Sequence, residues 1–189
     1  GSQPFGGEGL SGTGPKAGGP QYLQRFSMAE TRIAEAARVQ ADRGALEAAL
    51  AALPDPRDRV LSVTDLPGPT GESNRLSTHP RGRVLCLGPG AEAAEAQKRA
   101  AEAAGCTAVA VEGVVPAAWL AEIGPLEAVI LWAEAETARP CAQALAAREG
   151  ALVPLITEAD PAPRLVLERH LCIDTTAAGG NAALLAASG

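Results

Sequence analysis

The chain has 189 residues, of which 47% are apolar and 20% are charged, so its composition is that of a folded protein. Its formal net charge of −6 argues against a nucleic-acid partner, and no uncharged apolar run reaches the roughly 18 residues that a membrane span requires. Aromatic residues make up only 3%, so any core must be built from Ala, Leu, Val and Ile. Such a core buries less area per residue, which favours docking onto a larger body.

Residues 1–20 are so rich in glycine that neither a helix nor an ordinary strand is expected there. A flexible linker is one interpretation. Phe5, Leu10 and Lys16 are unlike the residues of a Gly/Ser linker, however, and they favour an ordered loop in which the backbone approaches a ligand closely. The only methionine lies inside the chain, so we expect the chain to be a piece of a longer protein.

The following segments are predicted to be extended, then helical, then irregular. Residues 21–28 are predicted to be extended, and residues 29–53 to be helical, either as one helix or as two that are broken near Gly44, before two prolines end the helical segment. Residues 54–82 are rich in Pro, Gly, Ser, Thr and Asn and show no clear period. We predict a linker there that lies as a strap across a surface.

Residues 83–170 alternate short apolar runs with helical segments. The predicted strands are 84–87, 108–111, 128–132, 152–156 and 165–167, and the predicted helices are 91–104, 115–123 and 137–148. Unbroken apolar strands between helices are typical of a parallel sheet covered on both faces. We therefore predict an α/β protein with a Rossmann-like parallel sheet and helices on both faces, preceded by a glycine-rich loop, a helical segment and a long connector.

One segment of this region fits the dinucleotide fingerprint G-x-G-x-x-G/A. Residues 88–93 (GPGAEA) follow a predicted strand and open a predicted helix, and Glu112 ends the next strand, where a ribose-binding acid would lie. A proline in the turn and acidic residues in the first turns of the helix oppose a bound pyrophosphate. A structural turn is the favoured interpretation, and Gly88, Gly90 and Glu112 remain vestigial candidates for cofactor binding.

The four cysteines and two histidines give no ligand or nucleophile motif. No CxxC pair is present, and the histidines lie far apart, so we predict no metal site. Cys86 and Cys172 lie in apolar runs and are predicted to be buried, reduced thiols. Because the sequence supplies no activating base for any cysteine, no catalytic residue is assigned.

Three further segments carry a resemblance when they are taken together. Residues 3–20 (QPFGGEGLSGTGPKAGGP) resemble the loop near the end of the aldehyde dehydrogenase module of the proline utilization A (PutA) family. Residues 71–76 (GESNRL) and 79–89 (HPRGRVLCLGP) resemble the start of the extra C-terminal domain of the longer PutA proteins. Residues 175–182 (TTAAGGNA) resemble the motif with which PutA chains end, and the order of the segments matches the family.

This resemblance implies four regions. Residues 1–53 would be the C-terminal end of an L-glutamate γ-semialdehyde dehydrogenase module, and residues 54–82 a linker. Residues 83–171 would be a Rossmann-like domain of the aldehyde dehydrogenase superfamily, and residues 172–189 a C-terminal motif.

The resemblance also implies the activity of the full enzyme, a bifunctional oxidoreductase of bacterial proline catabolism. An FAD-dependent proline dehydrogenase makes pyrroline-5-carboxylate, and an NAD-dependent dehydrogenase with a catalytic cysteine oxidises the derived L-glutamate γ-semialdehyde to glutamate. Those cofactor-binding regions and that cysteine would lie upstream. We therefore expect this chain to hold neither NAD nor FAD and to be inactive alone, and its status as an enzyme stays open. The implied partners are the upstream domains, the semialdehyde and further copies in an oligomer.

The residues implied to contact substrate are Gly18, Gly19 and Phe26. Backbone N–H groups of the two glycines would hold the substrate carboxylate, which requires donors without an obstructing Cβ. The aromatic ring of Phe26 would pack on the aliphatic part of the substrate. A motif implied to cover the substrate-channelling cavity comprises Thr175, Thr176, Ala177, Ala178, Gly179, Gly180 and Asn181.

Two alternatives remain open for the domain at residues 83–171. It is either a module that still binds a dinucleotide, or an oligomerisation or scaffold domain. For the full enzyme the resemblance implies a cytoplasmic location and leaves peripheral membrane association open.

Overall fold

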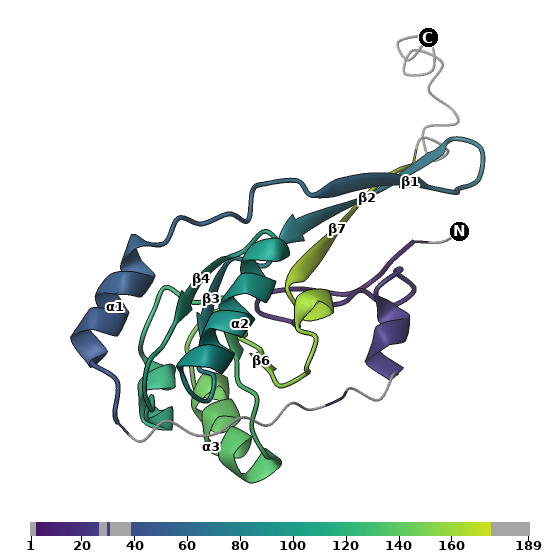
Figure 1. Ribbon diagram of the computed structural model, residues 1–189. Coiled ribbons are helices and arrows are strands. Elements are labelled where there is room, and N and C mark those ends of the chain that lie inside the picture. The colour runs from purple at the N-terminus through teal and green to yellow at the C-terminus, as the bar shows by residue number, and fades with distance from the viewer. Residues whose placement is uncertain (1–2, 27–29, 31–38, 175–189) are drawn as a thin grey trace.

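The computed structural model describes residues 3–26, 30 and 39–174, which form an α/β body and a second, antiparallel sheet (Figure 1). The body is built on a parallel sheet of order β4-β3-β5-β6. Its strands are β3 (Arg83–Cys86), β4 (Thr107–Ala110), β5 (Ala128–Ile130) and β6 (Leu155–Ile156). The predicted Rossmann-like parallel sheet is confirmed.

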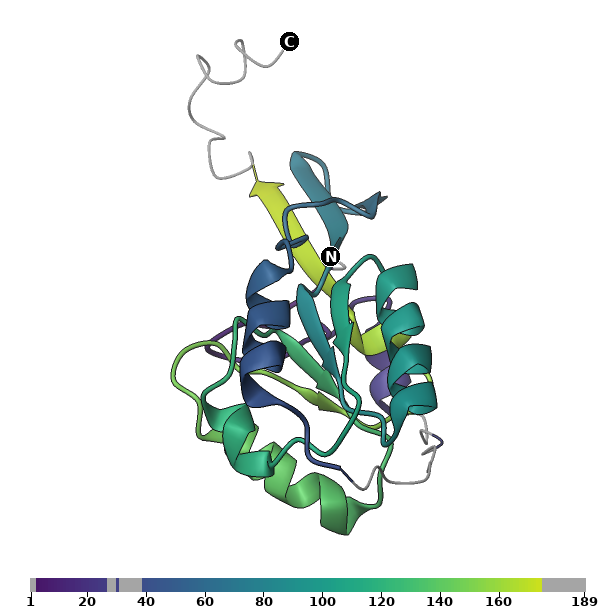
Figure 2. The same ribbon diagram turned by 60° about the vertical axis from the view of Figure 1, so that its left-hand side comes forward.

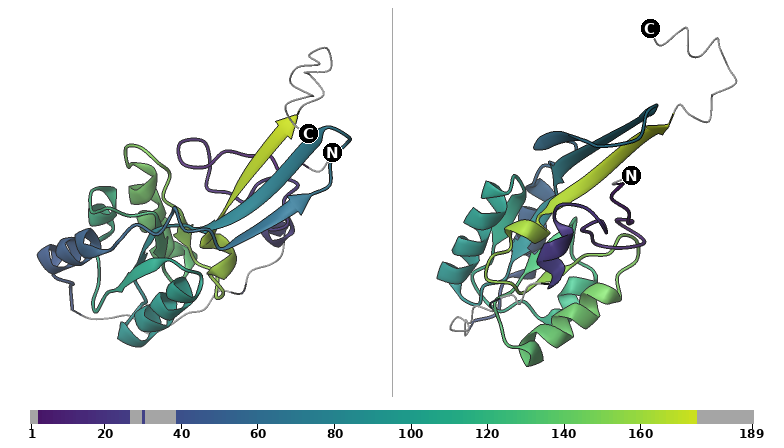
Figure 3. Two further views of the ribbon diagram at one scale, coloured as in Figure 1. Left: turned by 90° about the horizontal axis from the view of Figure 1, so that it is seen from above. Right: turned by 90° about the vertical axis from the view of Figure 1, so that its right-hand side faces the viewer.

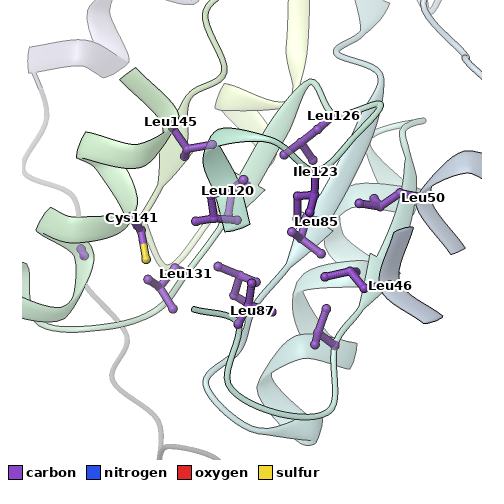
Figure 4. Close-up of a cluster of buried hydrophobic side chains, with 14 of the residues drawn as sticks. Leu46, Leu50, Leu85, Leu87, Leu120, Ile123, Leu126, Leu131, Cys141 and Leu145 are labelled. Atoms are coloured by element: carbon purple, nitrogen blue, oxygen red, sulfur yellow. The ribbon is translucent and has the colours of Figure 1, made fainter. Parts of the chain in front are cut away.

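Helices cover both faces of this sheet (Figure 2). Helix α2 (Ala91–Ala103) lies on one face, and α1 (Arg43–Ala52), α3 (Ala135–Ala146) and a 3-10 helix (Ala117–Ala121) lie on the other. The run Val84–Leu87 shows why the strands read as continuous apolar stretches. Val84 and Cys86 point into the core beneath α2, whereas Leu85 and Leu87 belong to the core of the opposite face (Figure 4).

Helix α1 is shorter than the predicted helical segment. It begins after Asp42, whose carboxylate accepts a hydrogen bond from the N–H of Ala45 at 2.8 Å, and it buries Leu46 and Leu50. Gly44 lies in the first turn of this helix, and residues 39–42 before it are not helical, so the helical segment is interrupted close to Gly44. The rest of the predicted segment, at 29 and 31–38, lies outside the described residues.

The second sheet corrects the predicted linker. Strands β1 (Ser62–Leu66) and β2 (Glu72–Pro80) form an antiparallel hairpin within residues 54–82, and β7 (Val166–Asp174) pairs with β2 along its whole length. This sheet projects away from the α/β body (Figure 3). The predicted fifth strand therefore exists, but it belongs to the antiparallel sheet. Strand β7 also runs continuously through residue 172, where the C-terminal motif was expected to begin.

Three smaller elements also differ from the predictions. Tyr22–Phe26 is a 3-10 helix within the segment predicted to be extended, and the predicted helix at 115–123 is a short 3-10 helix. Helix α3 starts at Ala135, so Pro140 lies inside the helix and not in its first turn. Pro140 has no N–H to donate to the carbonyl oxygen of Glu136, so the helix continues past it with one backbone hydrogen bond missing.

Candidate functional site

The glycine-rich segment closes on itself as a loop. Phe5 and Ala17 exchange backbone hydrogen bonds of 2.9 and 2.6 Å, and a second antiparallel bridge joins Glu8 to Thr13. The Lys16 ammonium donates to the carbonyl oxygen of Gly6 across the same loop at 2.5 Å. The Lys16 side chain thus holds the loop together from within.

The structure places the two predicted anchor glycines in different surroundings. Gly18 is exposed and has a φ of +73°, a conformation that favours glycine. Gly19 is buried, and its N–H donates to the carbonyl oxygen of Lys16 at 3.1 Å. A Cβ on Gly19 would lie 3.1 and 3.2 Å from the two carboxylate oxygens of Glu168, so the backbone is pressed against that side chain.

Phe26 ends the 3-10 helix that follows the loop. Its side chain is 71% exposed, and its ring meets the ring of Tyr22 edge to face at a centroid distance of 5.2 Å. The ring is therefore held by Tyr22 and remains accessible.

Glu168 of β7 is a site residue that sequence reasoning missed. Its side chain is 1% exposed, and its carboxylate accepts hydrogen bonds from the N–H groups of Lys16 at 2.9 Å and Gln21 at 3.4 Å. Its own N–H donates to the Glu8 carboxylate at 3.2 Å. A charge directly after the apolar run Leu165–Leu167 was the available signal, because buried carboxylates are found where hydrogen bonds compensate them.

Arg81 holds the far side of the loop. This arginine is 6% exposed and donates through Nη2 to the carbonyl oxygen of Thr13 at 2.6 Å, and through Nε to the carbonyl oxygen of Arg164. The N–H of Leu152 donates to the carbonyl oxygen of Gly9 at 2.8 Å. Arg81 and Leu152 therefore hold the glycine-rich loop in place, although both lie far from it in sequence.

The candidate dinucleotide turn lies where the order of strands reverses. Gly88 follows β3, which has β4 on one side and β5 on the other, the position at which open α/β sheets bind ligands. Its N–H, however, donates to Oε1 of Gln97 at 2.9 Å, and its carbonyl oxygen accepts from Nε2 of Gln97 at 2.6 Å and from the N–H of Trp132 at 2.8 Å. The polar backbone groups of Gly88 are thus satisfied within the protein.

The other two vestigial candidates are accessible. Gly90 precedes α2 with a φ of +80°, and the first turn of that helix carries the acidic Glu92. Glu112 is exposed beyond the end of β4. Negative charge at a helix N-terminus opposes a bound phosphate, because it competes for the same positive end of the helix dipole.

The cysteines divide into two kinds. Cys86, Cys106 and Cys141 are buried, and burial raises the pKa of each thiol, so none is prepared to act as a thiolate. Cys172 is exposed, which corrects the predicted burial, because its strand lies at the end of the projecting sheet. Among the described residues no group of His, Cys, Asp and Glu could hold a metal ion, and no helix is long and apolar enough to cross a membrane. The motif Thr175–Asn181 lies outside the described residues.

No family model matches the chain, but curated proteins and solved structures resemble it. The bifunctional protein PutA of Salmonella typhimurium is 36% identical over 234 aligned positions, which cover 98% of this chain and 18% of that protein. The PutA of Escherichia coli is 35% identical over the same shares, and that of Rhizobium meliloti is 33% identical. A solved Bradyrhizobium japonicum proline utilization A variant is 28% identical, with a TM-score of 0.35, over 50% of this chain and 13% of that one.

The aligned stretch with the Salmonella protein is longer than this chain, so that relative carries additional residues within it. The chain spans about a fifth of the length of the curated relatives it matches. For the Salmonella protein this share is 18%. Over nearly its whole length, the chain is therefore homologous to one region of the bifunctional proteins named PutA.

Proposed function

We propose that this chain is the C-terminal part of a bifunctional enzyme that oxidises proline to glutamate. Within that enzyme, it supplies the loop that anchors L-glutamate γ-semialdehyde and a non-catalytic domain that covers the cavity through which the intermediate passes. The observation that carries the proposal is the similarity to PutA proteins along 98% of the chain. FAD and NAD would be bound by the upstream domains of the full enzyme.

The anchoring role agrees with the chemistry of the loop. A substrate carboxylate needs preorganised N–H donors and free approach to the backbone, and Gly18 is exposed in a conformation that favours glycine. The exposed ring of Phe26 offers an apolar surface for the methylene groups of the semialdehyde. The substrate would lie against the exposed Gly18 and Phe26 while the upstream module performs the oxidation, and Gly19, whose buried N–H already donates to Lys16, would shape the turn beside them.

The covering role agrees with the state of the Rossmann-like domain. The backbone of Gly88 in its dinucleotide turn is bonded to Gln97, and burial raises the pKa of its three buried thiols, so neither feature favours cofactor binding or catalysis there. Such a domain can exclude bulk water from a reactive intermediate and keep it from escaping. We propose that residues 175–181, which follow directly after β7, complete this cover.

Truncation of the full enzyme tests the proposal. Removal of residues 175–189 leaves β7 intact to Asp174. We expect the flux from proline to NADH to fall several-fold while each half-reaction, assayed with its own substrate, keeps its rate. Equal losses in the coupled assay and in either half-reaction would contradict a covering role.

A separate assay tests the anchoring role. The full enzyme should oxidise L-glutamate γ-semialdehyde with a far lower KM than an uncharged aldehyde of similar length, such as pentanal, because only the former carries a carboxylate. Equal KM values for the two aldehydes would exclude an anchor for carboxylate.

A further inference from the structure

Glu168 lies on β7 of the antiparallel sheet, and its carboxylate makes hydrogen bonds to the glycine-rich loop. Its carboxylate is nearly fully buried, at 1% exposure, and accepts from the N–H groups of Lys16 and Gln21. A buried carboxylate is tolerated only where hydrogen bonds replace its hydration. The loop therefore satisfies Glu168, and Glu168 in turn restrains the loop.

The two donors flank the predicted anchor. Lys16 precedes Gly18 and Gly19, and Gln21 follows them, so the Glu168 carboxylate joins the two ends of the turn that carries both glycines. The turn is completed by the N–H of Gly19, which donates to the carbonyl oxygen of Lys16. The conformation of Gly18 and Gly19 is thus fixed from outside the loop.

The same restraint extends to the aromatic residue. The N–H of Tyr22 donates to the carbonyl oxygen of Gly19 at 3.0 Å and starts the 3-10 helix that ends at Phe26. A shift of the turn would therefore move Phe26 together with the glycines. All three residues expected to contact substrate depend on the segment that Glu168 holds.

We propose that Glu168 is a positioning residue for the carboxylate anchor: it preorganises the turn from Lys16 to Gln21 so that a substrate carboxylate finds the exposed backbone of Gly18 in place. This inference rests on the anchoring role proposed above. It gives the C-terminal domain a second task besides covering a cavity, because β7 would shape the substrate site of the neighbouring dehydrogenase module. Preorganised donors bind an anion better than mobile ones, since the ordering cost is already met.

The hydrogen bonds between Glu168 and the loop indicate which substitution is informative. The N–H groups of Lys16 and Gln21 donate to different oxygens of the Glu168 carboxylate. In Glu168→Gln the amide has nearly the same shape but offers one acceptor and one donor group, so one N–H of the loop loses its partner. This change removes the restraint with little change in volume.

The experiment uses the full enzyme and two aldehydes. We expect Glu168→Gln to raise the KM for L-glutamate γ-semialdehyde by about tenfold, as for loss of one hydrogen bond to a charged group. The KM for pentanal, the KM for NAD and the proline dehydrogenase half-reaction should keep their values. Glu102→Gln, an equal loss of charge at an exposed position of α2, serves as the matched control and should change none of them.

A second variant acts from the side of the loop. Gln21→Pro removes the N–H that donates to Glu168 and should raise the same KM, and the two changes together should raise it less than the product of their separate effects. If the KM for the semialdehyde is unchanged in both variants, or if the KM for pentanal rises equally, the positioning role is overturned. If the unsubstituted enzyme already fails to prefer the semialdehyde over pentanal, the anchoring role itself fails, whatever Glu168 does.

Discussion

Gln97 and Gly88 form a closed pair in which the side-chain amide of one makes both hydrogen bonds to the backbone of the other, at 2.9 and 2.6 Å. Gln97 is 0% exposed and comes from α2, the helix that the Gly88 turn itself begins. The turn is therefore held against α2, the helix that follows it, and the N–H of Gly88 donates to the side chain of Gln97.

Because that N–H is taken, we predict that the chain does not bind NAD at micromolar concentration. Isothermal titration calorimetry with NAD should show no heat beyond dilution. Micromolar binding that is lost in Glu112→Gln would show that the turn after β3 is a working dinucleotide site, since Glu112 lies where a ribose-binding acid would lie.

Gln97→Ala should destabilise the fold. The substitution leaves the N–H of Gly88 buried without its partner, which costs about 1–3 kcal/mol. Urea unfolding followed by circular dichroism measures the loss. Gln143→Ala, at an exposed position of α3, should change the free energy of unfolding by less than about 0.5 kcal/mol. Equal effects of the two substitutions would mean that the Gly88 pair contributes nothing.

The ion pair between Arg83 and Glu127 is expected to matter more than the exposed pairs. Both side chains are 16% exposed, the closest N–O distance is 2.8 Å, and Glu127 also accepts from the N–H of Arg83 at 2.7 Å. Glu127→Gln should lower the free energy of unfolding by about 1–3 kcal/mol. Glu122→Gln removes an exposed partner of Arg43 and should cost less, because water screens an exposed ion pair. A larger effect of Glu122→Gln would reverse this ranking.

Asp55 predicts a small dependence of stability on pH. Hydrogen bonds from the Arg57 guanidinium hold the pKa of the Asp55 carboxyl below its ordinary value of 3.8. A carboxyl whose folded-state pKa is lowered contributes stability above its unfolded-state pKa, and this contribution is lost as the pH falls through the lowered pKa.

Asp55→Asn should therefore be less stable than the unsubstituted chain at neutral pH, and the difference should shrink as the pH falls below about 4. The difference should be less than about 1 kcal/mol, because the two side chains are 35% and 42% exposed and water screens the pair. Urea titrations at several pH values measure it, with the exposed Asp58→Asn as control. A gap that is equally large at the lowest pH would refute the assignment to Asp55.

The cysteines should differ in reactivity under native conditions. Cys172 is exposed, whereas the other three thiols are buried. A thiol reagent such as Ellman's reagent should modify one sulfur rapidly and the rest only on unfolding. Cys172→Ser should abolish the rapid phase, and Cys141→Ser should leave it unchanged. A rapid phase that survives Cys172→Ser would show that the body opens more readily than its packing indicates.

The parallel sheet could be predicted because its signals are local. Val84–Leu87 contributes alternately to the cores on the two faces, so the whole run must be apolar, and α2 follows it with a regular helical pattern. The closing of the Gly88 turn could not be predicted, because a glutamine on a helix is ordinarily solvated and only the packing of α2 buries Gln97.

The sequence by itself determined the α/β class and, through resemblance, the relation to PutA proteins. Only the tertiary structure decided the second sheet, because β2 is largely polar and is stabilised by backbone pairing with β7, a partner far along the chain. The same pairing brings Glu168 against the glycine-rich loop. A burial that depends on two segments from opposite ends of the chain leaves no periodic pattern in either one, so it becomes visible only when the chain is folded.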